Sequence, residues 1–404
     1  MKIALNSDGF YEWGGGIDFI KYILSILETK PEICIDILLP RNDIHSLIRE
    51  KAFPFKSILK AILKRERPRW ISLNRFNEQY YRDAFTQNNI ETNLTFIKSK
   101  SSAFYSYFDS SDCDVILPCM RVPSGNLNKK AWIGYIYDFQ HCYYPSFFSK
   151  REIDQRNVFF KLMLNCANNI IVNAHSVITD ANKYVGNYSA KLHSLPFSPC
   201  PQLKWFADYS GNIAKYNIDK DYFIICNQFW KHKDHATAFR AFKIYTEYNP
   251  DVYLVCTGAT QDYRFPGYFN ELMVLAKKLG IESKIKILGH IPKLEQIELI
   301  KNCIAVIQPT LFEGGPGGGV TFDAIALGKK VILSDIDVNK EVNCGDVYFF
   351  QAKNHYSLND AMVKADESKI FYEPTTLIEL GLKRRNACAD FLLDVVKQEI
   401  ESRS

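Results

Sequence analysis

The most informative stretch of the chain is residues 308–328, which read Gln-Pro-Thr-Leu-Phe-Glu-Gly-Gly-Pro-Gly-Gly-Gly-Val-Thr-Phe-Asp-Ala-Ile-Ala-Leu-Gly. The pattern predicts a buried strand, a loop with five glycines and a short helix. Glycines let backbone N–H groups approach a phosphate closely, and the positive end of a helix favours an anion. The loop therefore predicts a nucleotide-diphosphate site at Gly317, Gly318, Gly319 and Val320. A glycine-rich turn without a ligand is the alternative.

Short apolar runs and amphipathic segments alternate around this loop, from residue 222 onward. Strands that are apolar on both faces and separated by helices are typical of a parallel sheet covered on both sides. The sequence therefore predicts a doubly wound domain with strands at Tyr222–Cys226, Val252–Thr257, Ile285–Leu288, Ala305–Gln308 and Val331–Ser334.

The N-terminal half begins in the same way, with a strand, a glycine loop at residues 14–16 and an amphipathic helix. With 404 residues the chain is too long for one core, so we expect an α/β protein with two Rossmann-like domains facing across a cleft. A proline-rich stretch at 195–221 predicts the hinge. The expected parts are an N-terminal domain (1–200), a C-terminal domain (201–376) and a last helix (377–404) that packs back on the first domain. Further N-terminal strands are expected at Lys2–Asn6, Ile33–Leu39, Val115–Leu117, Ile133–Tyr137 and Asn169–Val172.

Composition narrows the class of protein. The formal charge of +5 is too small to indicate nucleic-acid binding. The 11 cysteines include no CxxC pair, which favours reduced thiols in a cytoplasm over disulfides or a zinc cluster. No apolar run reaches the roughly 20 residues that span a bilayer, so we expect a cytoplasmic protein, either free or peripheral on the inner face of the membrane.

Two further segments carry polar residues at predicted strand ends. The first, Asn227-Gln-Phe-Trp-Lys-His-Lys-Asp-His235, follows a strand and contains Lys233, for which a surface lysine at a helix start is the alternative. Its two histidines lack a carboxylate partner at ligand spacing, so a metal site is not expected. The second segment, Tyr135-Ile-Tyr-Asp-Phe-Gln-His141, ends another strand and contains Asp138.

These motifs resemble glycosyltransferase family 4, a retaining family with the GT-B fold. Its members carry a Glu-Gly start, a glycine loop and a second acid on the next helix before an Ala-x-Ala-x-Gly stretch. Glu313 resembles the first acid and Asp323 the second, although Asp323 is Asp rather than Glu and stands two residues further on than usual. The resemblance implies that Glu313 meets the hydroxyls of the donor sugar and Asp323 the ribose.

The resemblance also extends to the other motifs. Lys233 resembles the family's diphosphate-binding lysine, whereas Gln228 stands in place of its arginine, so one positive charge is lost. Gly15 and Gly16 resemble the family's cleft-facing glycine loop. Asp138 resembles the acid of its His-Asp motif, with a tyrosine in the histidine seat. His141, three residues after Asp138, is a second candidate, and for His141 a purely structural role is the alternative.

Residues 53–70 interleave apolar residues at helical spacing with six basic ones. A basic amphipathic helix suits an anionic membrane surface or a lipid-linked acceptor. The alternative is a helix that packs its apolar face on the N-terminal core and leaves its lysines in water.

The resemblance implies a retaining glycosyltransferase that needs no metal and moves a sugar from a GDP-, UDP- or dTDP-sugar onto a glycan or lipid-linked saccharide. O-antigen or capsule synthesis is the expected setting. Glu313, Lys233, Asp138 and His141 are the candidate catalytic residues. The alternatives are a sugar-nucleotide epimerase or phosphorylase of the same fold, or a non-catalytic sugar-binding homologue, which the missing arginine at Gln228 favours.

Overall fold

The computed structural model describes residues 1–11, 14–41, 78–85, 92–98, 100–123, 130–262 and 264–403. The predicted basic helix at 53–70 lies outside these ranges. All 11 cysteines lie within them and are free. Among the described residues, no helix is both long enough and apolar enough to cross a bilayer.

The N-terminal domain is built on a seven-stranded parallel sheet with the order β3-β2-β1-β4-β5-β6-β7. Its strands are β1 (Lys2–Asn6), β2 (Cys34–Arg41), β3 (Thr92–Lys98), β4 (Val115–Cys119), β5 (Ala131–Ile136), β6 (Asn169–Val172) and β7 (Lys191–Ser194). The helices are α1 (Gly14–Leu27), α3 (Glu78–Phe85), α4 (Ser101–Ser110), α5 (Gln140–Tyr143), α6 (Lys150–Cys166) and α7 (His175–Tyr184).

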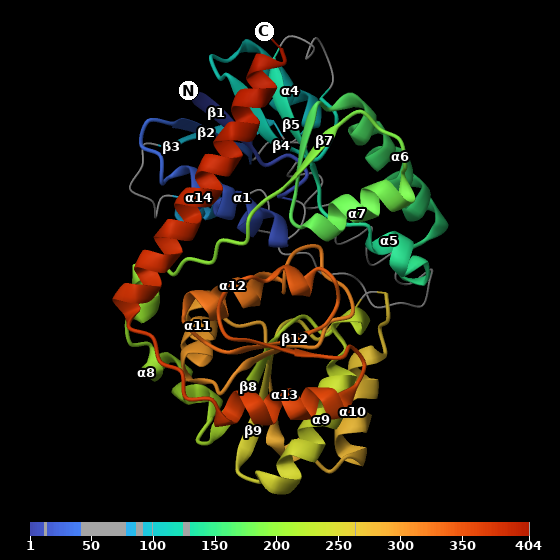
Figure 1. The fold of residues 1–404 in the computed structure, drawn as a ribbon, viewed down its shortest axis with the longest axis vertical. Helices are drawn as coiled ribbons and strands as arrows, with labels where there is room; N and C mark the ends of the chain where they lie inside the picture. The colour runs from blue at the N-terminus through green and yellow to red at the C-terminus, as the bar shows by residue number, and fades with distance from the viewer. Residues whose placement is uncertain are drawn as a thin grey trace.

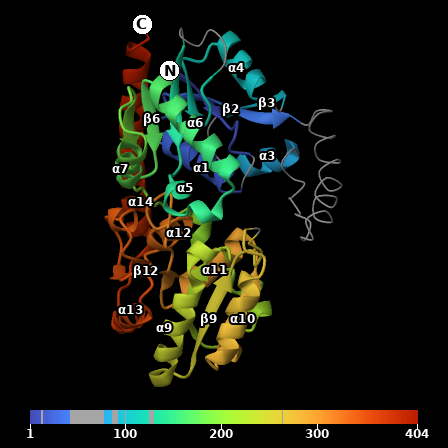
Figure 2. The ribbon, with the colours of Figure 1, turned by 90° about the vertical axis from the view of Figure 1, so that its right-hand side faces the viewer.

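The C-terminal domain repeats this plan on a six-stranded parallel sheet with the order β10-β9-β8-β11-β12-β13. Its strands are β8 (Asp221–Cys226), β9 (Val252–Thr257), β10 (Ile285–Gly289), β11 (Val306–Gln308), β12 (Val331–Ser334) and β13 (Val347–Phe350). The helices are α9 (His235–Tyr248), α10 (Tyr268–Lys278), α11 (Lys293–Asn302), α12 (Gly319–Ala326) and α13 (His355–Glu367). Figure 1 shows the two domains one above the other, and Figure 2 shows the same pair from the side. The predicted pair of doubly wound domains is confirmed.

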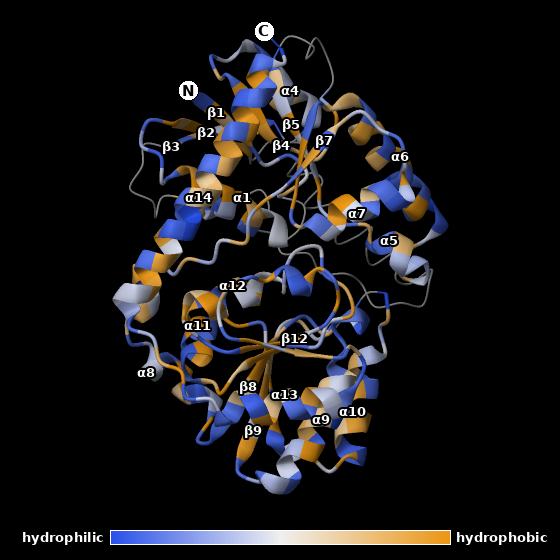
Figure 3. Ribbon diagram, viewed as in Figure 1, coloured by the Kyte–Doolittle hydropathy of each residue, from blue (hydrophilic) through white to orange (hydrophobic). Residues whose placement is uncertain are grey.

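The central strands are apolar because helices cover both faces of each sheet. In Figure 3, β8 and β9 are orange along their length, whereas α9 and α10 mix orange with blue. The cores hold many fully buried aliphatic and aromatic side chains, each of which contributes about 1.5–3 kcal/mol when removed from water. The two sheets thus provide rigid edges from which loops extend.

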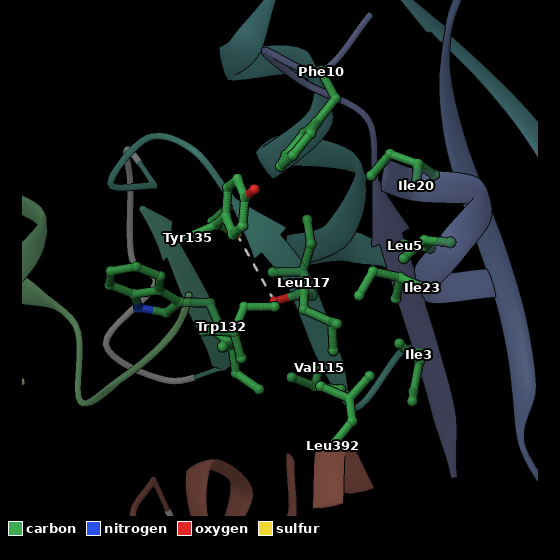
Figure 4. Packing of buried hydrophobic residues seen from close by; sticks show 14 of the residues in the cluster. Ile3, Leu5, Phe10, Ile20, Ile23, Val115, Leu117, Trp132, Tyr135 and Leu392 are labelled. Carbon is green, nitrogen blue, oxygen red and sulfur yellow. Dashed lines mark hydrogen bonds between the residues drawn. The ribbon is translucent and has the colours of Figure 1, made fainter. Parts of the chain in front are cut away.

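The last helix, α14 (Pro374–Glu401), runs from the lower domain to the upper one in Figure 1. Its Cys388, Ala389 and Leu392 are fully buried in the N-terminal core. Figure 4 shows Leu392 beside Val115 and Trp132. The segment between the sheets contains the short helix α8 (Ser210–Ile213) and 3-10 turns, so α14 is a second connection between the two domains.

Candidate functional site

The glycine loop after β11 is held by buried hydrogen bonds to the backbone N–H and C=O of Gly317. The carbonyl oxygen of Gly317 accepts from Gln308 Nε2 at 2.6 Å and from Thr321 Oγ1 at 2.6 Å, and its N–H donates to Asn339 Oδ1 at 3.0 Å. Gly317 has φ +63°, and a Cβ atom there would lie 2.4 Å from Thr321 Oγ1. The loop therefore requires glycine at this position and has a fixed shape.

Helix α12 begins where this fixed loop ends. Its N-cap is Gly318, which offers no side chain to the first N–H groups. Gly319 is exposed, and apart from its chain neighbours and the backbone of its own helix no described atom lies within 4 Å of a Cβ atom built on it. The first turn of a helix carries free N–H groups and a partial positive charge. The structure therefore presents the exposed backbone of Gly319 at a helix N-terminus, which is suited to an anion.

Lys233 and Glu313 lie beside this helix end. Lys233 ends the 3-10 turn η6 (Lys231–Lys233) after β8, and Glu313 follows the neighbouring strand β11. The Lys233 ammonium forms an ion pair with Glu313 Oε1, and the two side chains are only 14% and 10% exposed. A Cβ atom on Gly318 would lie 3.3 Å from Glu313 Cδ, which places this pair directly against the loop. The structure thus brings together three features that the sequence predicted for the site: Lys233, Glu313 and the glycine loop.

Asp323 lies on α12 and meets a residue that the sequence had not singled out. Its carboxylate pairs with the ammonium of Lys293, the first residue of α11. Burial raises the pKa of Asp323, and Lys293 opposes that rise. Asp18, on the first turns of α1 in the other domain, raises it further. Phe322, the residue before Asp323, contacts Tyr22 of α1 with ring centroids 5.6 Å apart, so the second acid lies close to the N-terminal domain.

Asp138 reaches the same region from the N-terminal domain, just after β5. It accepts the N–H of Gln140 at 2.9 Å, and Arg156 Nη1 lies 3.5 Å from its Oδ1. A Cβ atom on Gly314 would lie 3.4 Å from Asp138 Oδ2. Burial raises the pKa of Asp138, Arg156 lowers it and Glu313 raises it. Asp138 therefore lies against the loop that begins at Glu313, and each of these two carboxylates has its own cation.

His141, three residues after Asp138, is held in an aromatic cluster. It is 1% exposed, packs against Phe139 and Phe160, and pairs its Nε2 with Asn157 Oδ1 at 2.9 Å. Burial lowers the pKa of His141, so the neutral ring is favoured. Its surroundings are those of a packed aromatic residue.

The remaining predicted residues take different positions. Gly15 and Gly16 form the first turn of α1, which corrects the expected loop: a Cβ atom on Gly16 would lie 2.1 Å from the carbonyl oxygen of Phe10, so glycine permits close packing there. Gln228 is exposed after β8. Among the described residues, no three His, Cys, Asp or Glu side chains form a group that could hold a metal ion.

A comparison of the sequence with protein-family models finds a match in the second domain. Residues 211–375 match the model described as "Glycosyl transferases group 1". Over this range the second domain is similar to the group 1 glycosyltransferases. The matched range contains β8 to α13 and therefore Lys233, the glycine loop, Glu313 and Asp323. This chain is a glycosyltransferase.

Solved structures show the same architecture over the whole chain. Sucrose-phosphate synthase from Thermosynechococcus elongatus is 15% identical over 98% of both chains, with a TM-score of 0.61. HepE from Anabaena, in complex with UDP-glucose, is 13% identical over 100% of this chain and 99% of that one, with a TM-score of 0.59. WaaG, a glycosyltransferase involved in lipopolysaccharide biosynthesis, is 13% identical over 100% and 99%, with a TM-score of 0.52. The fold is GT-B, as predicted. No curated protein matches the chain.

Proposed function

We propose that this enzyme transfers a sugar from a nucleotide diphosphate, with retention of anomeric configuration, onto a glycan or a lipid-linked saccharide. The observation that carries the proposal is the open N-terminal end of α12 beside the Lys233–Glu313 ion pair. An uncapped helix start and an adjacent ammonium are the groups that bind a diphosphate. Synthesis of a surface polysaccharide is the setting that we propose.

In this proposal the diphosphate lies over the N–H groups of Gly319 and Val320, and Lys233 meets its charge. As the bond to the sugar breaks, negative charge grows on the leaving phosphate, and donors that are already in place stabilise it without reorganisation. The fixed Gly317 peptide keeps those donors in place. No step of this account requires a metal.

Glu313 and Asp323 divide the remaining recognition of the donor. Glu313 stands at the entrance of the loop, where its carboxylate accepts hydrogen bonds from sugar hydroxyls. Asp323, which pairs with Lys293, accepts from the ribose. Carboxylates suit both tasks because charge-assisted hydrogen bonds are about twice as strong as neutral ones.

Asp138 is the N-terminal domain's contribution in this proposal. It faces Glu313 and the glycine loop from the acceptor side and orients the acceptor hydroxyl. The leaving phosphate takes the proton of that hydroxyl, so attack and departure occur on the same face of the sugar. Closure of the two domains around the reactants excludes water and prevents hydrolysis.

The named relatives support the nucleotide-sugar donor, since HepE is described in complex with UDP-glucose. WaaG, from lipopolysaccharide biosynthesis, supports a lipid-linked acceptor. The basic sequence at 53–70 fits such an acceptor or an anionic membrane surface. We therefore propose a cytoplasmic enzyme that works at the inner face of a membrane.

A donor screen tests the proposal. UDP, GDP, dTDP and their sugars are each added to the protein, and the unfolding midpoint is measured. The sugar nucleotide that stabilises the protein is then incubated with and without a saccharide acceptor. Transfer that requires the acceptor supports the proposal. Isomerised donor in the absence of acceptor would indicate an epimerase. Dependence on free phosphate would indicate a phosphorylase, and binding without turnover would indicate a sugar-binding protein. Each of these three results would contradict the proposed function.

A further inference from the structure

The 3-10 turn η8 (Asn339–Glu341), which follows β12, connects the glycine loop with the other domain. Asn339 is fully buried and uses both ends of its side-chain amide. Its Oδ1 accepts the N–H of Gly317, and its Nδ2 donates to the carbonyl oxygen of Ser334 at 2.9 Å and to Ser334 Oγ at 3.1 Å. Asn339 therefore ties the loop to the end of β12.

Glu341, two residues later, points to the N-terminal domain. Its two carboxylate oxygens accept the backbone N–H groups of His175 and Ser176, each at 2.7 Å. These residues begin α7, and the N-cap of α7 is Ala174, which has no polar side chain. Glu341 therefore caps a helix of the opposite domain, and its charge is favourable at that helix end.

The loop and this cap meet the same short segment of the N-terminal domain. A Cβ atom on Gly315 would lie 3.2 Å from Asn173 Cβ, two residues before the N–H groups that Glu341 binds. The glycine loop and η8 thus approach the start of α7 together. A change in the distance between the domains would disturb both contacts.

We propose that Asn339 and Glu341 are positioning residues for the transfer reaction. Asn339 sets the Gly317 peptide, and Glu341 holds the N-terminal domain against the loop, so that Asp138 comes over the donor only when the domains are closed. This inference rests on the proposed function. Because the cap and the loop bond belong to a single turn, domain closure and the shape of the donor site are mechanically coupled.

The two residues have separable effects on binding and turnover. Glu341→Gln keeps the shape of the side chain but removes its charge and one of its two acceptor oxygens, so only one of the two N–H groups keeps a partner. We expect kcat to fall about tenfold, because a neutral hydrogen bond is about half as strong as a charge-assisted one. The Kd of the bare nucleoside diphosphate stays unchanged, since the second domain alone forms the cradle. Asn339→Ala, in contrast, weakens nucleotide binding as well as turnover.

The experiment compares Glu341→Gln with Asp337→Asn, a carboxylate-to-amide change at a side chain that is 92% exposed just before the same turn. Turnover, nucleotide Kd and the radius of gyration from X-ray scattering are measured for both. The expected result is a lower kcat and a larger radius for Glu341→Gln alone. A wild-type kcat and radius in Glu341→Gln would overturn the inference, as would an equal loss of nucleotide affinity. If the unaltered protein binds none of UDP, GDP and dTDP, the proposed function fails, and this role falls with it.

Discussion

Removal of the Lys233 ammonium is the sharpest single perturbation of the proposed chemistry. The side chain is 14% exposed, so water screens its charge little. Loss of one such preorganised group raises a reaction barrier by about 3–4 kcal/mol. Since 1.36 kcal/mol is a factor of ten in rate, we expect Lys233→Ala to lower kcat by about 10²–10³.

The same substitution also affects stability, because it leaves the Glu313 carboxylate, which is 10% exposed, without its cation. Breaking a buried ion pair costs about 3–5 kcal/mol of folding free energy. The double variant Lys233→Met with Glu313→Gln removes both charges. It is expected to recover most of the unfolding midpoint and none of the turnover, which separates catalysis from folding.

The assay is kcat at saturating donor, together with the thermal midpoint of each variant. Lys220→Ala is the matched control: this lysine lies just before the opposite end of β8 and pairs with Asp251 at the surface. It should have wild-type turnover. Near-normal turnover in a folded Lys233→Ala protein would refute the placement of the diphosphate.

Two further predictions concern other parts of the chain. Arg156 lowers the pKa of Asp138, so Arg156→Gln should raise that pKa and move the acid limb of the pH–activity profile to higher pH. Arg151→Gln, at an exposed position of the same helix, is the control and should leave the acid limb in place. An unchanged acid limb in Arg156→Gln would exclude Asp138 as the ionising group. The segment 53–70 should bind vesicles of acidic lipid at low salt, since each basic residue contributes about 1 kcal/mol near such a surface. Replacement of Lys56, Lys60 and Lys64 by Glu should abolish vesicle binding and leave transfer to a soluble acceptor unchanged. If the unaltered protein does not bind acidic vesicles, it has no such membrane-binding surface.

The interior of both sheets could be predicted from the sequence because its strands are buried on both faces and read as continuous apolar runs. The strands that the sequence did not reveal are β3, β7 and β13, and each lies at an edge of its sheet. An edge strand pairs with a neighbouring strand on one side only. Polar residues therefore interrupt the apolar pattern in β3 and in β7 (Lys191–Ser194), whereas β13 reads Val-Tyr-Phe-Phe and has no such interruption.

Some residues of the candidate site could likewise be predicted from the sequence, and others could not. The glycine loop was visible because five glycines stand close together, and Lys233 because it follows a predicted strand. Asn339 and Arg156 were missed because their partners, Gly317 and Asp138, are distant in sequence and become neighbours only on folding. No local pattern distinguishes either residue from a surface residue of its type.

The central claim is that the open end of α12 holds a nucleoside diphosphate, and Gly319→Asp tests it most directly. The new side chain has room and a favourable helix position, so the ligand-free midpoint should hold or rise, while its charge occupies the phosphate site. At 100 times its Kd, the nucleoside diphosphate should add about 2.7 kcal/mol to the free energy of unfolding of the unaltered protein. We predict that this ligand no longer raises the unfolding midpoint of Gly319→Asp but still raises that of Gly319→Ala. An equal rise in Gly319→Asp and the unaltered protein would contradict the account.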